Sequence, residues 1–314
     1  MLRLIRTRLL VGIPVVLIAS TFAFFLVRLV PGSPAQYILG SQATPENTAV
    51  LNEQLGLNKP ILEQYLSWIL NAVRGDFGQS YITSTDVTQT LSTALPPTLS
   101  LSILSIMVVF VGGQALGMLA AVNGGWLDRI IQVVANVLMA IPNFWLASLL
   151  VLVFAIRLLL LPATGYTSID DASFSLWARG LILPVVAISA AYMAQVVMQA
   201  RASVLDIMSR DFVRTLQATG VPRRTIVVKH VLRNSAIPVT TVAGLIFIFM
   251  LSGTVVVEYT FNIPGMGALM VNAVNRHDLA VVQGAIVYFS VVVIVVNIAV
   301  DILAAWLNPR MRVS

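Results

Sequence analysis

The chain has 314 residues, of which 58% are hydrophobic and only 10% are charged. A typical soluble domain has about 25% charged residues, so this composition excludes an ordinary water-soluble fold and indicates a membrane protein. The net charge of +6 does not indicate nucleic-acid binding, because the basic residues are spread along the chain beside apolar segments. There is no cysteine, and the two histidines, His230 and His277, lie far apart, so neither disulfides nor a histidine-rich metal site is expected.

Six apolar segments are long enough to cross a bilayer, whose hydrocarbon core of roughly 30 Å needs about 20 helical residues. They are residues 9–30, 99–122, 131–157, 181–200, 239–258 and 281–305. These runs are too long and too continuous for barrel strands, so we expect an all-α polytopic membrane protein. The first segment follows three arginines and resembles a signal sequence, but it is too long for one and is interpreted as an uncleaved anchor.

The distribution of Lys and Arg predicts the orientation. If the N-terminus lies in the cytosol, the inner segments are 1–8, 123–130, 201–238 and 306–314, and they hold 13 of the 19 Lys and Arg residues. By the positive-inside rule, both termini are expected in the cytosol.

The outer loop, residues 31–98, is expected to contain short helices. Thr44 followed by Pro45 is typical of a helix start, and Gly56 of its end. An amphipathic helix is predicted after Pro60, closed by Gly75.

The inner loop, residues 201–238, is predicted to form two short helices. The first has apolar residues at helical spacing from Val204 to Leu216, Gly220 is a natural stop, and Pro222 a natural restart. The second runs from Arg223 to Arg233. A loop that combines apolar faces with seven basic residues is suited to contact another protein, although a purely topological signal is the alternative.

Two further patterns concern the spans. Pro142 is expected to kink the third span. Gly113 and Gly117 form a small-xxx-small pair, which predicts a close helix contact.

Several motifs occur in an order typical of one family. They are Arg210–Gly220 with Val-Pro-Arg-Arg and Lys229–Pro238, Leu55–Pro60, Gln64-Tyr65, Trp68, Gly75–Ser80, Leu95–Leu99, Ile141–Leu146, Leu161–Gly165, Val257-Glu258, Phe261–Gly267 and Asp301 through Pro309-Arg310. On these motifs the chain resembles the permease subunits of dipeptide and oligopeptide ABC transporters. The stretch from Arg210 resembles the family's "EAA" loop, although Arg214-Thr215-Leu216 replaces Glu-Ala-Ala and Arg233 stands where many ABC permeases have proline. Both departures favour the peptide branch.

The resemblance implies a type I ABC importer permease fold with both termini inside. It also implies a division into residues 1–94, with the anchor 9–30 and the extracytoplasmic loop 31–94, a permease core 95–305 with five spans and the cytosolic coupling loop 201–238, and a cytosolic tail 306–314.

The implied function is that of a transport subunit in the plasma (inner) membrane of a bacterium, forming a pathway for peptides by alternating access. The implied partners are a second similar permease, two ATP-binding subunits docking on loop 201–238, an extracytoplasmic peptide-binding protein and the lipid bilayer, with no nucleic acid. The sequence has no Gly-x-x-x-x-Gly-Lys-Ser/Thr loop, so no cofactor is expected on this chain, and ATP and Mg²⁺ are expected on the partner subunits. Nickel chelates, glutathione or other small solutes remain alternative cargoes.

The expected ATPase-coupling residues lie in the inner loop. They are Arg214, Thr215, Leu216, Ala218, Gly220, Pro222, Arg223, Arg224, His230 and Arg233. Possible pathway residues are Asn136, Asn143 and Glu258. The alternative for the two asparagines is helix packing, and for Glu258 a place in water at the outer interface.

The residues disfavour two other classes of function. An ion-coupled secondary transporter usually has ionisable residues near the bilayer midplane, yet spans two and four have none. An intramembrane enzyme is disfavoured because no His-Glu-x-x-His, Gly-x-Ser-x-Gly or midplane Asp pair is present.

Overall fold

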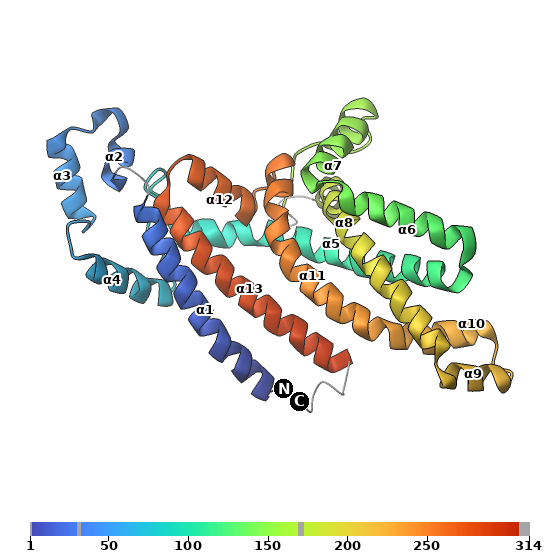
Figure 1. Ribbon diagram of the computed structural model, residues 1–314. Coiled ribbons are helices and arrows are strands. Elements are labelled where there is room, and N and C mark those ends of the chain that lie inside the picture. Colours follow the sequence, from blue (N-terminus) through green and yellow to red (C-terminus); the bar gives the residue numbers. More distant parts are fainter. Residues whose placement is uncertain (1, 30–32, 169–172, 308–314) are drawn as a thin grey trace. The chain divides into compact units, whose positions relative to one another are not determined.

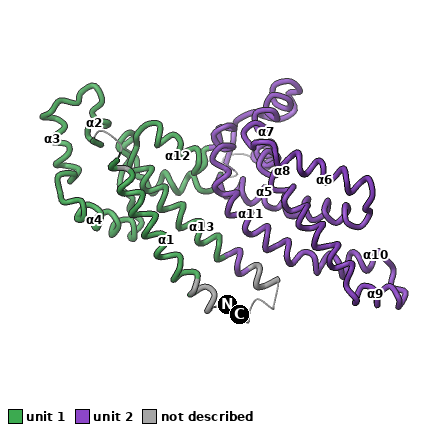
Figure 2. The backbone as a smooth tube through the Cα atoms, in the orientation of Figure 1, with its two compact units in different colours: residues 1–97, 264–298 green, residues 98–263, 299–314 purple. Residues whose placement is uncertain are grey.

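The computed structural model describes residues 2–29, 33–168 and 173–307. Within these ranges the chain is helical, with one isolated bridge between Gln79 and Asp86. The last seven residues of the predicted tail lie outside the described residues. The chain divides into two compact units, residues 1–97 with 264–298 and residues 98–263 with 299–314 (Figure 2).

The first unit contains the N-terminal helix and the long loop that follows it (Figure 1). Its elements are α1 (Leu2–Arg28), α2 (Pro34–Leu39), the 3₁₀ turn η1 (Gly40–Gln42), α3 (Pro45–Gln54), α4 (Ile61–Val73), the first turns of α5 (Val87–Asn123), α12 (Met266–Asn275) and most of α13 (Leu279–Leu307).

Local sequence signals explain these short helices. The Thr44 side chain accepts a hydrogen bond from the Asn47 backbone N–H and caps α3 as predicted. Gly56 and Gly75 have φ angles of +67° and +85°, as expected for glycines that follow helices. Helix α2 was not predicted; Ser33 and Gln36 form its capping box.

The second unit contains the remaining helices. They are α6 (Gly125–Ala140), α7 (Asn143–Leu150), the π-helical segment η2 (Val151–Arg157), α8 (Phe174–Ser209), α9 (Asp211–Ala218), α10 (Arg223–Thr225), the π-helical segment η3 (Ile226–Val231) and α11 (Leu232–Thr260). Helix α8 packs against α6, α7 and α11, and their apolar side chains form the core of this unit.

Five described helices are long and apolar enough to cross a membrane. They correspond to five of the six predicted spans, and three of them are much longer than predicted; α5, for example, begins at Val87 and not at residue 99. The third predicted span is different. It consists of two helices, α6 and α7 with η2, which are bent by 101° relative to each other at the break. The bend at Pro142 is therefore larger than the kink that the sequence predicts. Ile141 is extended, with a ψ angle of 123°, because a residue before proline avoids the helical region, and Pro142 is the extended N-cap residue of α7, with a ψ angle of 135°.

The inner loop also departs from the prediction. The first predicted short helix is divided at Arg210, whose ψ is 148°, so residues 204–209 belong to α8 and only Asp211–Ala218 form α9. The second predicted helix is not separate, because α10 and η3 continue into α11 as one helix, Arg223–Thr260.

The predicted glycine contact is confirmed. A Cβ atom on Gly113 would lie 2.6 Å from Val196 Cγ1, and one on Gly117 would lie 2.6 Å from both Ala200 Cβ and the Val197 carbonyl oxygen. The two glycines therefore let α5 approach α8 more closely than any side chain would allow.

Candidate coupling site

Helix α9 is a short amphipathic helix held to the second unit by its buried face. Val213 is 1% exposed and packs in a cluster with Val204 and Ile207 of α8 and Ile226 and Val231 of η3. Helix α9 is therefore packed against the end of α8 and against η3, which continues into α11.

The end of α9 is a complete Schellman motif. The Gly220 N–H donates to the Gln217 carbonyl at 3.0 Å, and the Val221 N–H donates to the Leu216 carbonyl at 3.1 Å. Gly220 has a φ of +79°, in the left-handed region that favours glycine. The half-buried Leu216 and Val221 both pack against the Val213 cluster, which is the apolar contact that usually accompanies this motif. The turn therefore has a defined conformation.

The outer face of α9 and the following turn is exposed. Arg214, Thr215, Ala218, Gly220 and Pro222 all lie on the surface. Arg214 lies 3.6 Å from Asp211, an exposed ion pair of the kind that contributes little to stability.

The basic residues after the turn occupy different environments. Arg223 donates to the Val122 carbonyl at the end of α5, at 2.9 Å, whereas Arg224 is exposed beside it. His230 is half-buried in η3, and Arg233 is exposed one turn later. The structure thus brings Arg214 through Arg224 together around one turn and leaves His230 and Arg233 on the first turns of the long helix.

A groove lies next to α9 on the same unit, where α8 ends and α11 begins. It is lined by Gln199, Ala202, Ser203, Asp206, Ile207, Arg210, Phe212, Asn234, Ile237 and Pro238. Asp206 and Arg210 form an exposed ion pair at 2.7 Å on its rim, and Phe212 is 40% exposed. The combination of an exposed aromatic ring, a charged rim and a hydrogen-bonded turn is suited to receive part of another protein.

The possible pathway residues come from three helices, α6, α7 and α11. Asn136 is exposed on α6, and Asn143 is half-buried at the start of α7, beyond the break at Pro142. Glu258 has no exposed surface, and the Thr98 hydroxyl donates to its Oε1 at 2.7 Å. The alternative that placed Glu258 in water at the interface is therefore wrong for this structure.

Sequence reasoning missed an ion pair between α6 and α8. The Arg201 guanidinium donates twice to Asp128, with distances of 2.6 and 2.7 Å, and Gln132 donates to the same carboxylate at 2.9 Å. The sequence contains one indication of this pair: Asp128 precedes the third predicted span and Arg201 follows the fourth, which places both on the same side of the membrane. Such bidentate pairs combine strength with a fixed geometry, so this one sets the position of α6 on α8.

No group of three or more His, Cys, Asp or Glu residues within the described ranges is arranged to hold a metal ion.

The family comparison covers almost the whole chain. Residues 113–313 match the family described as "Binding-protein-dependent transport system inner membrane component". Residues 1–102 match the N-terminal region of the same kind of component.

Similar proteins of known name cover the full length as well. The chain is 39% identical over 313 residues to a glutathione transport system permease of Escherichia coli K12, covering 99% of both chains. It is 37% identical over 306 residues to a probable peptide ABC transporter permease of Sinorhizobium fredii, covering 97% of both. A putative peptide transport permease of Brucella abortus is 34% identical, with 99% of both chains covered.

Among solved structures, an inward-facing methionine ABC transporter contains a similar chain. The TM-score is 0.58 at 16% identity, and the match covers 70% of this chain and 97% of the other. At that identity the likeness concerns the fold, which is that of a type I ABC importer permease.

Proposed function

The chain belongs to the family of binding-protein-dependent transport inner-membrane components, and from this premise we propose which steps of transport its residues perform. It is the permease subunit of an ABC importer, a transport component of the bacterial inner membrane and not an enzyme. Permeases of such importers work with partner permease, ATPase and substrate-binding subunits.

The proposed cargo is a small peptide. Relatives at 34–39% identity over nearly the full length include permeases named for peptides and one named for glutathione, which is itself a tripeptide. We therefore propose di- or oligopeptides, with glutathione included in the class, and place nickel chelates and other small solutes second.

The proposed coupling element is α9 with its turn at Gly220. The observation that carries this proposal is that the turn is closed by two backbone hydrogen bonds and exposed on one side, while Val213 packs the other side of α9 against α8 and η3. A partner that moves α9 therefore moves the ends of two membrane-spanning helices. We propose that an ATP-binding subunit docks on Arg214, Thr215, Leu216, Ala218 and the turn that follows, and that ATP and Mg²⁺ are held by that subunit.

The rest of the proposed assembly depends on which side of the membrane α9 faces. If α9 faces the cytosol, both termini are cytosolic, and the outer loop 31–94 meets a peptide-binding protein. The core 95–305 pairs with a second permease, because a pathway needs more helices than this chain has. We propose that Glu258 lies next to the pathway, on the ground that a carboxyl group with no exposed surface in a membrane bundle is costly unless it serves a function.

Reconstitution tests this function. The chain is assembled in liposomes with the second permease, the ATPase subunits and the binding protein encoded beside it, and uptake of labelled dipeptide, glutathione and nickel–histidine chelate is measured with internal or external ATP. We expect uptake of the dipeptide or of glutathione, and we expect this uptake to require ATP on the side of the membrane that α9 faces. Uptake of the nickel chelate alone would contradict the proposed cargo, and ATP-independent uptake would contradict the coupling.

A further inference from the structure

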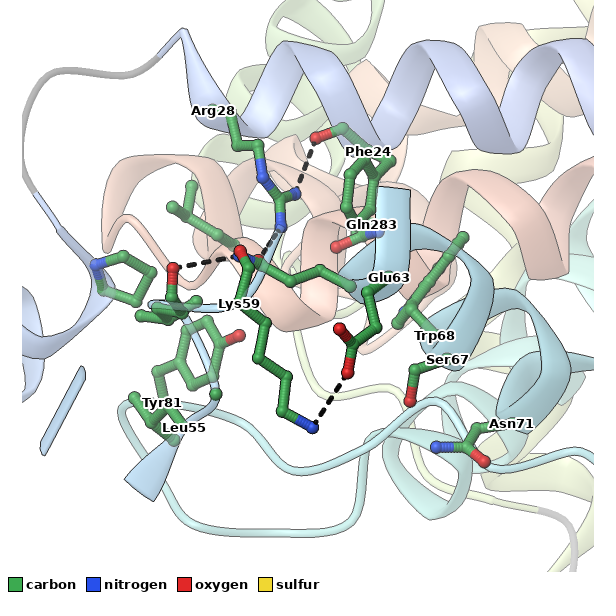
Figure 3. Close-up of a pocket in the computed structure, with 15 residues that line it drawn as sticks. Phe24, Arg28, Leu55, Lys59, Glu63, Ser67, Trp68, Asn71, Tyr81 and Gln283 are labelled. Carbon is green, nitrogen blue, oxygen red and sulfur yellow. Dashed lines mark hydrogen bonds and ion pairs between the residues drawn. The ribbon is translucent and has the colours of Figure 1, made fainter. Parts of the chain in front are cut away.

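The first unit contains a pocket of about 350 Å³ between the end of α1, the face of α4 and the start of α13 (Figure 3). Its lining includes Arg28, Lys59, Trp68, Tyr81 and Gln283. No part of the transport function described above uses this pocket.

The inner part of the pocket presents hydrogen-bond donors. Gln283 is only 7% exposed, and its side-chain Nε2 has no hydrogen-bond partner among the described residues. An unpaired buried amide costs about 1–3 kcal/mol, so the site is incomplete without an acceptor.

Arg28 is fixed beside this amide. Its guanidinium lies 3.5 Å from the centre of the Phe24 ring and donates to the Phe24 carbonyl and to Gln64 Oε1. A guanidinium has five N–H groups, so it keeps donors for a further partner.

Tyr81 supplies a third polar group. Its loop is anchored because Asp278 accepts hydrogen bonds from the Ser80 hydroxyl and, at 3.2 Å, from the Tyr81 backbone N–H. Burial raises the pKa of the Tyr81 phenol, so the hydroxyl remains protonated at neutral pH and can donate. At the mouth, Lys59 pairs with Glu63 at 3.4 Å. Among the residues that line the pocket, Arg28 is therefore the one charge left unbalanced, which suits an anion rich in acceptor oxygens, while the Asp278 carboxylate behind Tyr81 accepts from Ser80 and the Tyr81 backbone.

The surroundings of the pocket indicate which anion. Arg28 lies in the last turn of α1, at the end of its apolar stretch, a position typical of an arginine at the level of the lipid headgroups. This level holds for either orientation of the chain, because both bilayer surfaces carry headgroups.

Helix α4, which lines the pocket, also has an exposed apolar face. Leu62, Leu66, Leu70 and Val73 lie on one face of the helix and are 49–82% exposed. The opposite face packs on α1, where Tyr65 contacts the Phe24 ring edge-on at 5.1 Å and bonds to the Thr21 hydroxyl at 2.8 Å. This is the pattern of a helix lying in the membrane interface, with Trp68 at the boundary.

We propose that the pocket binds the phosphodiester of a phospholipid headgroup, with Arg28, Tyr81 and the Gln283 amide as donors and the acyl chains lying along the apolar face of α4. The lipid supplies the acceptor that the Gln283 amide lacks. It also ties α4 to the outer end of α1 and so positions the loop that α4 belongs to.

Native mass spectrometry of the purified, delipidated transporter complex tests this proposal. Phosphatidylglycerol is added back, and its affinity is compared with that of a galactosyl diacylglycerol, which has the same tails and no phosphate. The wild-type complex is expected to retain one more phosphatidylglycerol per copy of this chain than the Gln283→Leu and Arg28→Gln complexes at the same lipid concentration. Loss of one hydrogen bond to a charged group corresponds to about a tenfold weaker affinity.

The matched control is Arg74→Gln, which removes an exposed arginine just after α4 that does not line the pocket. Its phosphatidylglycerol affinity should equal that of the wild type. Gln283→Leu removes an unpaired polar group, so the lipid-free complex should melt at the wild-type temperature or above; this outcome separates a lipid site from a merely structural role.

Three results would overturn the proposal. These are equal retention of the galactolipid, full displacement of the phospholipid by inorganic phosphate alone, and unchanged lipid affinity in both variants. If the variants bind lipid normally but no longer bind the extracytoplasmic binding protein, the pocket recognises a protein carboxylate and the lipid assignment is wrong.

Discussion

Substituting Gly220 by leucine separates a fold defect from a coupling defect. Gly220 occupies the C′ position of the Schellman motif at φ +79°, and a Cβ atom there would meet no described atom within 4 Å. The cost within this chain is therefore conformational, about 1–2 kcal/mol for placing a side chain in the left-handed region. This is too little to prevent insertion of a chain whose other contacts are intact.

The added side chain nevertheless projects from the surface where we place the ATPase subunit. Gly220→Leu is expected to reach wild-type membrane levels but to lose uptake, with the ATPase subunits either dissociated or hydrolysing ATP without a response to substrate. Uptake into proteoliposomes, co-purification and ATPase activity measure these outcomes. The isolated wild-type chain is the negative control, since it has no phosphate loop and should show no ATPase activity.

Gly220→Ala is the matched control, because it imposes the same left-handed strain with one methyl group. Retained uptake in Gly220→Ala together with lost uptake in Gly220→Leu identifies bulk at the docking surface as the cause. Normal uptake and unchanged co-purification of Gly220→Leu would refute the reasoning, and the inner loop would then be only a topological signal.

Three other experiments test separate parts of the structure. Gly117→Val should reduce the yield of folded protein, because its Cβ would lie 2.6 Å from the backbone of α8; wild-type yield and melting temperature would contradict the close contact. In intact cells Asp86→Cys should react with an impermeant maleimide and Arg223→Cys only after the membrane is opened; the reverse pattern would exclude the orientation. Glu258→Gln should lower uptake while the complex still assembles, because a glutamine oxygen can still accept from Thr98; wild-type uptake kinetics would leave Glu258 a packing role only.

Sequence patterns predicted most of the helices because these helices contain apolar runs of bilayer length or are bounded by clear start and stop residues. Thr44, Gly56 and Gly75 bound the outer-loop helices as expected, and Gly220 ends α9. The break at Arg210 was missed because it involves neither glycine nor proline. It arises where the tertiary contacts of Val213 turn α9 away from the axis of α8.

The site was less predictable than the fold. The position of the third-span break follows from Pro142, but its angle of 101° depends on the packing of α6 and α7 on α8. The Arg201–Asp128 pair joins residues 73 positions apart, and the unpaired Gln283 amide is visible only once α13 is packed. Such long-range contacts leave no periodic or local signal in a single sequence.

Site-specific crosslinking tests the coupling of α9 to an ATPase most directly. The chain has no cysteine, so Ala218→Cys places one thiol on the exposed face of α9, and Asp86→Cys serves as the control in the outer loop. In the assembled complex a thiol-anchored photocrosslinker at Ala218 should capture the ATP-binding subunit, with a yield that changes on adding ATP, and the Asp86 control should not capture it. A fully assembled, transport-active complex in which the Ala218 probe never reaches the ATP-binding subunit would contradict the proposal that α9 transmits ATP-driven motion to the membrane helices.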